Sequence, residues 1–309
     1  MLPVTVRAAG TCGEWVQGWL DGEAVLVSCP IDRRIEVRLT RSADGSVCLP
    51  AGCTKAACAL ERVRALLGQA HAGAKVDILN PLPRGRGYAS STADIVGVSV
   101  AMAAALGAEL SPEQLGRLAC EIEPSDSIMF PGWSLFAYRS GEWHRPLGEG
   151  VCLPLVILDP GESVDTVIFN RKLDLQRVRA LEPQTRESLA LMVEGLRRRS
   201  AECIGAAARL SASAYQQVAA SRLVEQAMGW AQALHAYGPV RAHSGSIVGI
   251  VFDTDFAALD AIAWLRRRFA GDVVFTHTAC EGVGRAQNGI TQRRVPDERS
   301  QWSAGGLLG

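Results

Sequence analysis

Residues 81–94 read Pro-Leu-Pro-Arg-Gly-Arg-Gly-Tyr-Ala-Ser-Ser-Thr-Ala-Asp, and this stretch decides the predicted fold. The apolar pattern before it, at 76–79, predicts a strand, and the apolar run at 90–106 predicts a helix. Its prolines and glycines keep the backbone out of regular structure, and the small residues after them let a bulky anion reach the main chain. Because the first N–H groups of a helix are unpaired and lie at the positive end of its dipole, the stretch predicts a phosphate-binding loop. The simpler alternative is an ordinary helix start with Ser90 or Ser91 as the N-cap.

Two other phosphate-binding templates do not fit this loop. A P-loop requires Gly-x-x-x-x-Gly-Lys-Ser/Thr, and the chain contains no such run. The dinucleotide fingerprint Gly-x-Gly-x-x-Gly fails because Ser90 stands where the third glycine belongs. Arg84 and Arg86 would add positive charge, and the adjacent serines would offer hydroxyls to phosphate oxygens or to a magnesium ion.

Away from the loop, the predicted strands and helices come in groups and do not alternate strictly. Strands are predicted at 4–8, 24–29, 35–39, 76–79, 133–138, 153–158, 239–242, 246–252 and 272–276. Helices are predicted at 55–67, 90–106 and 111–122, over most of 173–237, and at 257–269. This grouping indicates an α+β fold, and a boundary near residue 150 would divide the chain into domains 1–150 and 151–309. The polar, glycine-rich end at 296–309 is expected to be loose.

Composition narrows the class of protein. The 309 residues are 48% hydrophobic and 21% charged, which is ordinary for a globular protein. Lys and Arg total 32 against 32 for Asp and Glu, so a nucleic-acid partner is not expected. The nine cysteines show no pairing pattern, and neither a signal peptide nor a long uncharged apolar run is found. We therefore expect a cytoplasmic protein with free thiols, no membrane partner and a small-molecule substrate.

The loop resembles the second motif of the GHMP kinases, the superfamily of galactokinase, homoserine kinase and mevalonate kinase. That motif reads Pro-x-x-x-Gly-Leu-Gly-Ser-Ser-Ala. The positions that fit it are Pro83, Gly87, Ser90, Ser91 and Ala93. The positions that depart from it are Tyr88 for Leu, Ala89 for the second Gly, and Thr92 for Ala.

Further segments resemble one branch of this superfamily, the L-threonine kinases of cobalamin biosynthesis. These segments are 10–18, 29–32, 122–126, 164–171 and 242–246. The resemblance implies a two-domain fold, with a ribosomal S5-like N-terminal domain and a ferredoxin-like, helix-rich C-terminal domain. It also implies an ATP- and Mg2+-dependent kinase that phosphorylates the hydroxyl of L-threonine.

The resemblance carries nucleotide-binding roles onto individual residues. The residues expected to bind the ATP phosphates are Gly87, Tyr88, Ala89, Ser90, Ser91 and Thr92. Ser91 would also contact the magnesium ion together with a carboxylate, for which Glu123 is the candidate and Glu121 the alternative.

Asp126 is the candidate catalytic base, because its Pro-Ser-Asp neighbourhood resembles the family loop that carries a catalytic aspartate. Orientation of the substrate, or an ordinary turn, are the alternative roles. Glu14 and Asp32 are candidates for the acceptor's ammonium group. Ser244 and Gly245 lie in a reduced form of the third family motif and are assigned to substrate binding.

Several readings stay open at this point. The alternative acceptors are serine, homoserine and ethanolamine, since a one-methyl difference is not readable from sequence. A nucleotide-binding regulator without catalysis is the alternative from another class. His243 is either a site residue or a packed side chain, and Cys12 is expected to be a small buried thiol. A homodimer is a further option.

Overall fold

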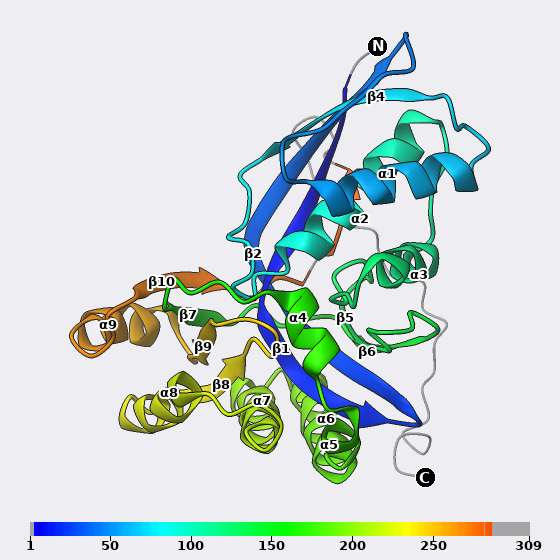
Figure 1. The fold of residues 1–309 in the computed structure, drawn as a ribbon. Helices are drawn as coiled ribbons and strands as arrows, with labels where there is room; N and C mark the ends of the chain where they lie inside the picture. Colours follow the sequence, from blue (N-terminus) through cyan, green and yellow to red (C-terminus); the bar gives the residue numbers. More distant parts are fainter. Residues whose placement is uncertain (1–2, 281, 286–309) are drawn as a thin grey trace.

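The structure, a computed structural model, describes residues 3–280 and 282–285. Two long antiparallel strands, β1 (Val4–Leu20) and β2 (Glu23–Ser42), form its centre. A turn at Asp21-Gly22 joins them. Figure 1 shows this pair as a long blue band that crosses the whole molecule and carries other elements along both halves.

One hydrogen-bonded sheet connects most strands of the described residues, in the order β10-β7-β9-β8-β1-β2-β4-β3. The remaining bounds on this path are β3 (Val47–Cys48), β4 (Gly73–Leu79), β7 (Pro154–Asp159), β8 (Tyr237–Arg241), β9 (Val248–Val251) and β10 (Asp272–His277). Off the path, β5 (Trp133–Phe136) pairs with β2 and with β6 (His144–Gly148), and β11 (Gly284–Arg285) pairs with β1. Because β1 pairs with β8 where Glu14 faces Arg241, strands from both halves of the chain share one sheet. The domain boundary at residue 150 stays a prediction.

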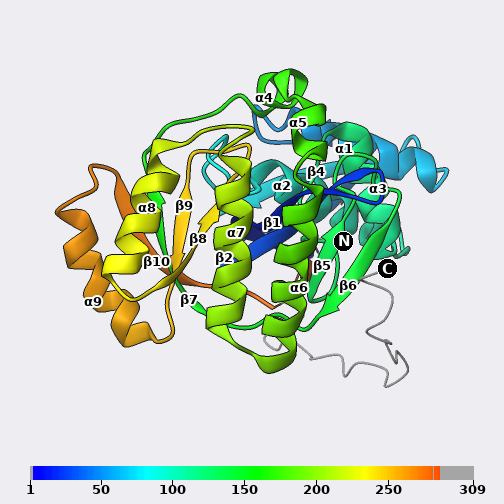
Figure 2. The ribbon, with the colours of Figure 1, turned by 90° about the horizontal axis from the view of Figure 1, so that it is seen from below.

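The helices pack on this sheet in two groups. The first group is α1 (Thr54–Leu66), α2 (Ser90–Ala105) and α3 (Pro112–Ile122). Most of α2 is buried, because its apolar surface packs against β1 and β2 and against α1. The second group is α4 (Thr166–Lys172), α5 (Leu175–Arg179), α6 (Glu182–Arg198), α7 (Ala201–Tyr215), α8 (Arg222–Ala233) and α9 (Asp255–Arg266). Figure 2 shows α6, α7 and α8 side by side across one face of the sheet.

The α+β fold expected from the sequence is confirmed, and most predicted elements lie within a few residues of their observed positions. The start of α3 has the expected Ser111 cap, where the hydroxyl accepts from the Gln114 amide at 3.2 Å. Three short or irregular strands, β3, β6 and β11, were not predicted. The segment 296–309 lies outside the described residues. Within the described part of the chain, no helix combines the length and the apolar character that a membrane crossing needs.

The prediction was also incomplete along β1, which continues far beyond residue 8. Its register with β2 shifts after Ala9, Thr11 and Glu14, so the side chains there do not alternate as in a regular strand. Gly13 lies in this irregular part and has a φ of +61°. This irregular middle of β1 passes directly under the start of α2, as the amide of Thr11 donates to the Tyr88 carbonyl at 3.1 Å.

Candidate active site

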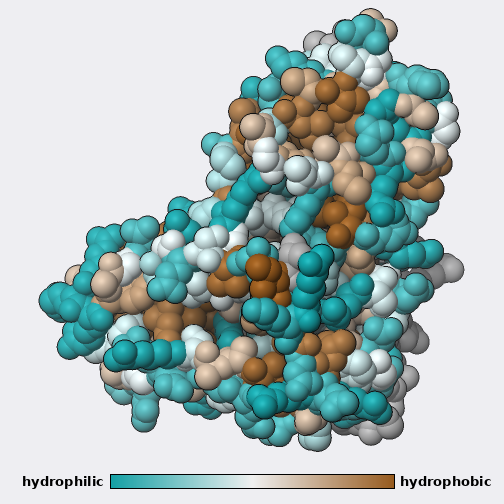
Figure 3. All heavy atoms as spheres, in the orientation of Figure 1, coloured by the Kyte–Doolittle hydropathy of each residue, from teal (hydrophilic) through white to brown (hydrophobic). Residues whose placement is uncertain are grey.

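The loop before α2 opens into a cavity of about 890 Å3. Its walls come from the start of α1, the loop and first turn of α2, the segment after α3, the start of α4 and the middle of β1. Figure 3 shows the molecule hollowed between its upper part, which holds α1 and α3, and its lower part, which holds α6 and α7. Residues far apart in sequence therefore meet at one opening.

The backbone of the loop is held from behind by the turn 242–246. The amide of Ser246 donates to the Arg86 carbonyl at 2.9 Å. Gly87 has a φ of +104°, and a Cβ there would collide with the Ala242 side chain. A Cβ on Gly245 would likewise collide with the Arg86 carbonyl. Gly245 therefore supports the loop from its far side, whereas its neighbour Ser244 lines the cavity itself.

The first turn of α2 presents its amides to the cavity without a serine cap. The N-cap is Ala89, which has a left-handed backbone with a φ of 55° and makes no side-chain cap bond. The alternative in which Ser90 or Ser91 caps the helix is therefore wrong. Ser90, Ser91 and Thr92 all line the cavity, and the amides of a first helical turn have no intrahelical partner. The loop can therefore receive an anion with its main chain.

The two arginines of the loop have different surroundings. The Arg86 guanidinium pairs with Asp159 at 3.2 Å, and the Tyr88 hydroxyl donates to the same carboxylate at 3.1 Å. Asp159 is buried, so these two contacts anchor the loop to the interior. The side chain of Tyr88 is therefore an anchor, and only its backbone contributes to the phosphate loop. Arg84 lines the cavity, donates to the Gly52 carbonyl at 2.6 Å and pairs with Asp94 at 3.3 Å. Of these two arginines, Arg84 is therefore the one placed to add positive charge to the cavity.

A hydroxyl and a carboxylate meet on the wall that faces α1. The Ser91 hydroxyl donates to Glu123 Oε1, and Lys55 Nζ pairs with Glu123 Oε2 at 2.5 Å. The Ser91 hydroxyl and the Glu123 carboxylate are hard oxygen donors, which suit Mg2+. In proteins this ion keeps several waters and takes further oxygens from phosphates. No group of three or more His, Cys, Asp or Glu residues suited to a metal occurs in the described part of the chain. The donor set fits a magnesium ion that binds together with a nucleotide.

Lys55 was missed by the analysis of the sequence, although a signal was present. It lies in the first turn of α1, where a positive charge is unfavourable because of the helix dipole. This first turn contains no acidic residue that could offset the charge. Such an unfavourable placement points to a role outside the helix. The alternative carboxylate, Glu121, pairs instead with Arg62 and is not part of the cavity wall.

Asp126 lies in the segment after α3 and is held by two hydroxyls. Its Oδ1 accepts from Ser28 at 3.1 Å and its Oδ2 accepts from Thr92 at 3.4 Å. Its own amide donates to the Thr92 hydroxyl at 3.2 Å. Burial, together with the nearby charges of Glu14 and Glu123, raises the pKa of Asp126 to about 7. A carboxyl of that pKa in a cavity is suited to accept a proton near neutral pH.

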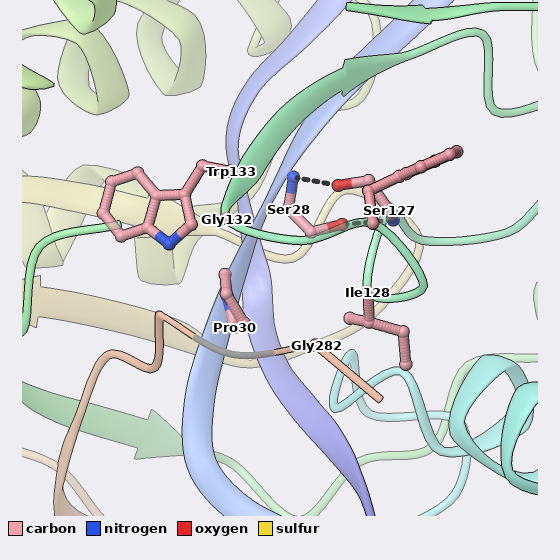
Figure 4. A pocket seen from close by; sticks show the side chains of 8 residues that line it. Ser28, Pro30, Ser127, Ile128, Gly132, Trp133 and Gly282 are labelled. Carbon is pink, nitrogen blue, oxygen red and sulfur yellow. Dashed lines mark hydrogen bonds between the residues drawn. The ribbon is translucent and has the colours of Figure 1, made fainter. Parts of the chain in front are cut away.

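The backbone around Asp126 is tied to β2 by a pair of serines. The amide of Ser127 donates to the Ser28 hydroxyl at 2.9 Å, and the amide of Ser28 donates to the Ser127 hydroxyl at 3.3 Å (Figure 4). A smaller space of about 230 Å3 adjoins this pair, next to Ile128 and Trp133. It is lined by no carboxylate, lysine, arginine or histidine, so we assign the chemistry to the larger cavity.

Glu14 forms the floor of the cavity, on β1. The amide of the preceding residue, Gly13, donates to the Gly87 carbonyl at 3.2 Å, which places Glu14 beside the phosphate loop. Glu14 Oε2 accepts from the amide of His243 at 3.0 Å and lies 2.6 Å from Nδ1 of the same residue. Burial raises the pKa of Glu14 to about 7, although the His243 amide and the Arg241 charge oppose this shift. The structure therefore brings Glu14 and Asp126, two carboxyls of raised pKa, to the wall of one cavity.

The other residues considered from the sequence lie elsewhere. Asp32 is exposed on β2 and is not part of the cavity wall. Cys12 is fully buried, as expected, and burial raises the pKa of its thiol. Thr166 and Asn170 of α4, which belong to the segment 164–171, also line the cavity. The segment before α4 contacts the loop, since the amide of Val164 donates to the Gly85 carbonyl at 2.7 Å.

The chain is similar to known proteins in sequence and in fold. Residues 54–130 match the family model for the GHMP kinases N terminal domain. The chain is 28% identical over 261 residues to an L-threonine kinase of Citrobacter freundii, covering 84% of this chain and 90% of the relative. It is 29% identical over 253 residues to an L-threonine kinase of Salmonella typhimurium, covering 80% and 82%. Among solved structures, homoserine kinase of Cytophaga hutchinsonii superposes with a TM-score of 0.72 at 18% identity, covering 93% of this chain and 98% of that one.

Proposed function

From the premise that the chain is a member of the GHMP kinase superfamily, we propose that it phosphorylates the hydroxyl of L-threonine to give O-phospho-L-threonine. The enzyme class is an ATP-dependent phosphotransferase with an alcohol acceptor. The observation that carries the proposal is the meeting, at one cavity, of a helix-start phosphate loop with two carboxylates of raised pKa, Glu14, which is buried, and Asp126, which is partly buried. The first suits a nucleotide, and the second suits an acceptor that carries both a hydroxyl and a cationic group.

The nucleotide side holds the phosphates by main-chain amides and by charge. In the proposal, the loop from Gly87 to Thr92 binds the phosphates, and Lys55 and Arg84 neutralise part of their charge. Ser91 and Glu123 would hold Mg2+, which on binding would neutralise charge between the phosphates. Phosphoryl transfer depends mainly on alignment and charge neutralisation, so these residues supply most of what the reaction needs.

The acceptor side supplies the proton acceptor. As the threonine oxygen attacks the γ-phosphorus and the bond to ADP breaks, the hydroxyl proton passes to the Asp126 carboxylate. The hydroxyls of Ser28 and Thr92 donate to the same carboxylate and keep it oriented. Glu14 is assigned to the ammonium group of threonine, and Ser244 to the polar groups of the acceptor.

The name of the two relatives supports L-threonine over other acceptors, since both are L-threonine kinases. We further propose that the reaction is cytoplasmic and that its product enters cobalamin biosynthesis. Serine, homoserine and ethanolamine present the same ammonium and hydroxyl chemistry, so the cavity lining alone does not separate them from threonine.

An assay of ADP release over a panel of hydroxy amino acids and amino alcohols tests the proposal. We expect the highest kcat/KM with L-threonine and no release without an acceptor. A higher kcat/KM for another amino alcohol would reassign the substrate and keep the enzyme class. Tight ATP binding without turnover of any acceptor would favour a nucleotide-binding regulator and overturn the proposed reaction.

A further inference from the structure

His243 is fully enclosed beneath the cavity floor, with 2% of its surface exposed. Its ring lies between Glu14 and Tyr215, and the two rings meet edge to face with centroids 4.3 Å apart. The ring Nε2 is buried and has no hydrogen-bond partner among the described residues. The ring therefore packs against Tyr215 and meets the Glu14 carboxyl through Nδ1.

Residue 243 makes two hydrogen bonds to one oxygen of Glu14. The backbone N–H donates to Oε2 at 3.0 Å, and the ring Nδ1 lies 2.6 Å from the same oxygen. When Glu14 is ionised, its carboxylate only accepts hydrogen bonds, and the hydrogen of this contact is then on Nδ1. Within the described ranges, no donor contacts the other oxygen, Oε1, and Glu14 lines the cavity. Residue 243 thus occupies Oε2 of Glu14 with two hydrogen bonds, and Oε1 remains available to a ligand in the cavity.

We propose that His243 is a positioning residue, which aims Glu14 Oε1 at the ammonium group of the acceptor without touching the acceptor itself. The inference rests on the proposed function, because it requires an acceptor with an amino group. It assigns a role to a histidine whose position in the motif at 242–246 left it undecided between a site residue and a packed side chain.

The charge state of the ring agrees with this role. Burial, and then the positive charge of Arg241, lower the pKa of His243, so the ring is neutral. The ionisable groups that face it are Glu14, Arg241 and Tyr215. A neutral donor orients the carboxylate and leaves its charge for the ligand, whereas an imidazolium would compete with the ammonium group.

Two substitutions at position 243 and one control separate positioning from packing. His243→Ala removes the ring donor, while His243→Asn keeps an N–H close to the place of Nδ1. Tyr215→Phe is the matched control, because its buried hydroxyl has no partner among the described residues and its ring packs on His243. All three change the same buried region, but only His243→Ala removes the side-chain hydrogen bond to Glu14, and the backbone one from residue 243 remains.

The measurement is calorimetric binding of L-threonine and of 3-hydroxybutyrate, which is threonine without its amino group, in the presence of Mg2+ and a non-hydrolysable ATP analogue. We expect His243→Ala to weaken threonine binding about 10- to 100-fold and to leave 3-hydroxybutyrate binding within about twofold of wild type. His243→Asn should recover most of the loss, and Tyr215→Phe should bind threonine as wild type does.

Equal weakening of both ligands in a folded His243→Ala variant would show a packing role and overturn the inference. Absence of threonine binding by the wild type would overturn it as well. Threonine that binds with the expected dependence on His243, but is not phosphorylated, would leave the inference standing and remove the proposed function.

Discussion

The charged side chains on the two sides of the cavity differ in their exposure to solvent. On the nucleotide side, Lys55 and Arg84 are partly exposed, and the phosphate loop offers main-chain amides. On the acceptor side, Glu14 is buried with 8% of its surface exposed, and burial raises the pKa values of Glu14 and Asp126 to about 7. The cationic side chains are thus partly solvated where a large anion would bind, whereas the carboxyls are desolvated where a proton would move.

This difference follows from what each side must do. A triphosphate brings several negative charges, so a site for it needs donors and cations that remain stable in water before it binds. A proton acceptor for an alcohol works best with a pKa near the operating pH, which a solvated carboxyl does not have. Burial next to a second carboxylate raises the pKa into that range. The comparison predicts that substitutions on the two sides affect different kinetic constants.

The largest effect is expected on the acceptor side, from Asp126→Asn. We expect kcat to fall by about 100- to 10,000-fold, because the amide cannot accept the hydroxyl proton, while ATP affinity stays within about threefold. The measurements are steady-state kinetics for kcat and calorimetry for ATP. Because the pKa of Asp126 is raised to about 7, wild-type kcat should rise with pH through that region, as the carboxyl loses its proton.

Asp77→Asn makes the same chemical change at an exposed position on β4 and serves as the control, with wild-type kinetics expected. Equal losses of turnover and of ATP affinity in Asp126→Asn would show that Asp126 supports the structure of the cavity and does not act as a base.

The second effect lies on the nucleotide side, from Ser91→Ala. Removal of this hydroxyl leaves Glu123 as the remaining proposed protein ligand of the metal, so the KM for Mg-ATP should rise about 10- to 100-fold. The KM for the acceptor should change little. Ser99→Ala is the control within the same helix, since the Ser99 hydroxyl donates to the Ile95 carbonyl away from the cavity. Unchanged kinetics in Ser91→Ala, measured over a range of Mg2+ concentrations, would remove this serine from the site.

A smaller effect is expected from Lys55→Met. Lys55 is about one-third exposed, so solvent weakens its interaction with phosphate, and the KM for Mg-ATP should rise about three- to tenfold. Arg62→Met is the control, because it removes the ion pair between Arg62 of α1 and Glu121 of α3. This pair is exposed and outside the cavity, so the kinetic constants should not change. A similar change of KM in both variants would indicate that helix packing, and not contact with the nucleotide, is the cause.

The nucleotide side was the easier one to predict from the sequence, because its loop is continuous in the chain. Prolines, glycines and serines at 81–94 predict an irregular loop and a helix start, and both are observed. The alternative with a serine cap was wrong, since propensity favours serine whereas Ala89 takes that place in a left-handed conformation. Propensity describes isolated helix starts and does not include the contacts that hold this loop from behind.

The acceptor side depends on contacts that no local pattern encodes. Glu14 and His243 are 229 positions apart, and they meet only because β1 pairs with β8. Asp126 was found through a family resemblance, but its hydroxyl partners Ser28 and Thr92 come from β2 and α2. The irregular register of β1 also hides the strand that carries Glu14.

The smallest predicted effect concerns stability and should have opposite signs on the two sides. Because the folded-state pKa of Asp126 lies above the ordinary value of 3.8, the folded protein binds more protons than the unfolded chain between about pH 4 and pH 7. This carboxyl therefore makes the protein less stable as pH rises through that window. Asp126→Asn removes the cost, so its melting temperature should exceed that of wild type by about 2 °C at pH 8 and by less at pH 5. Lys55→Met should instead melt slightly below wild type at both pH values, because it deprives Glu123 of a cation. Calorimetric melting at the two pH values checks both signs, and a pH-independent difference in Asp126→Asn would contradict the view that desolvation of this carboxyl is a cost of its function.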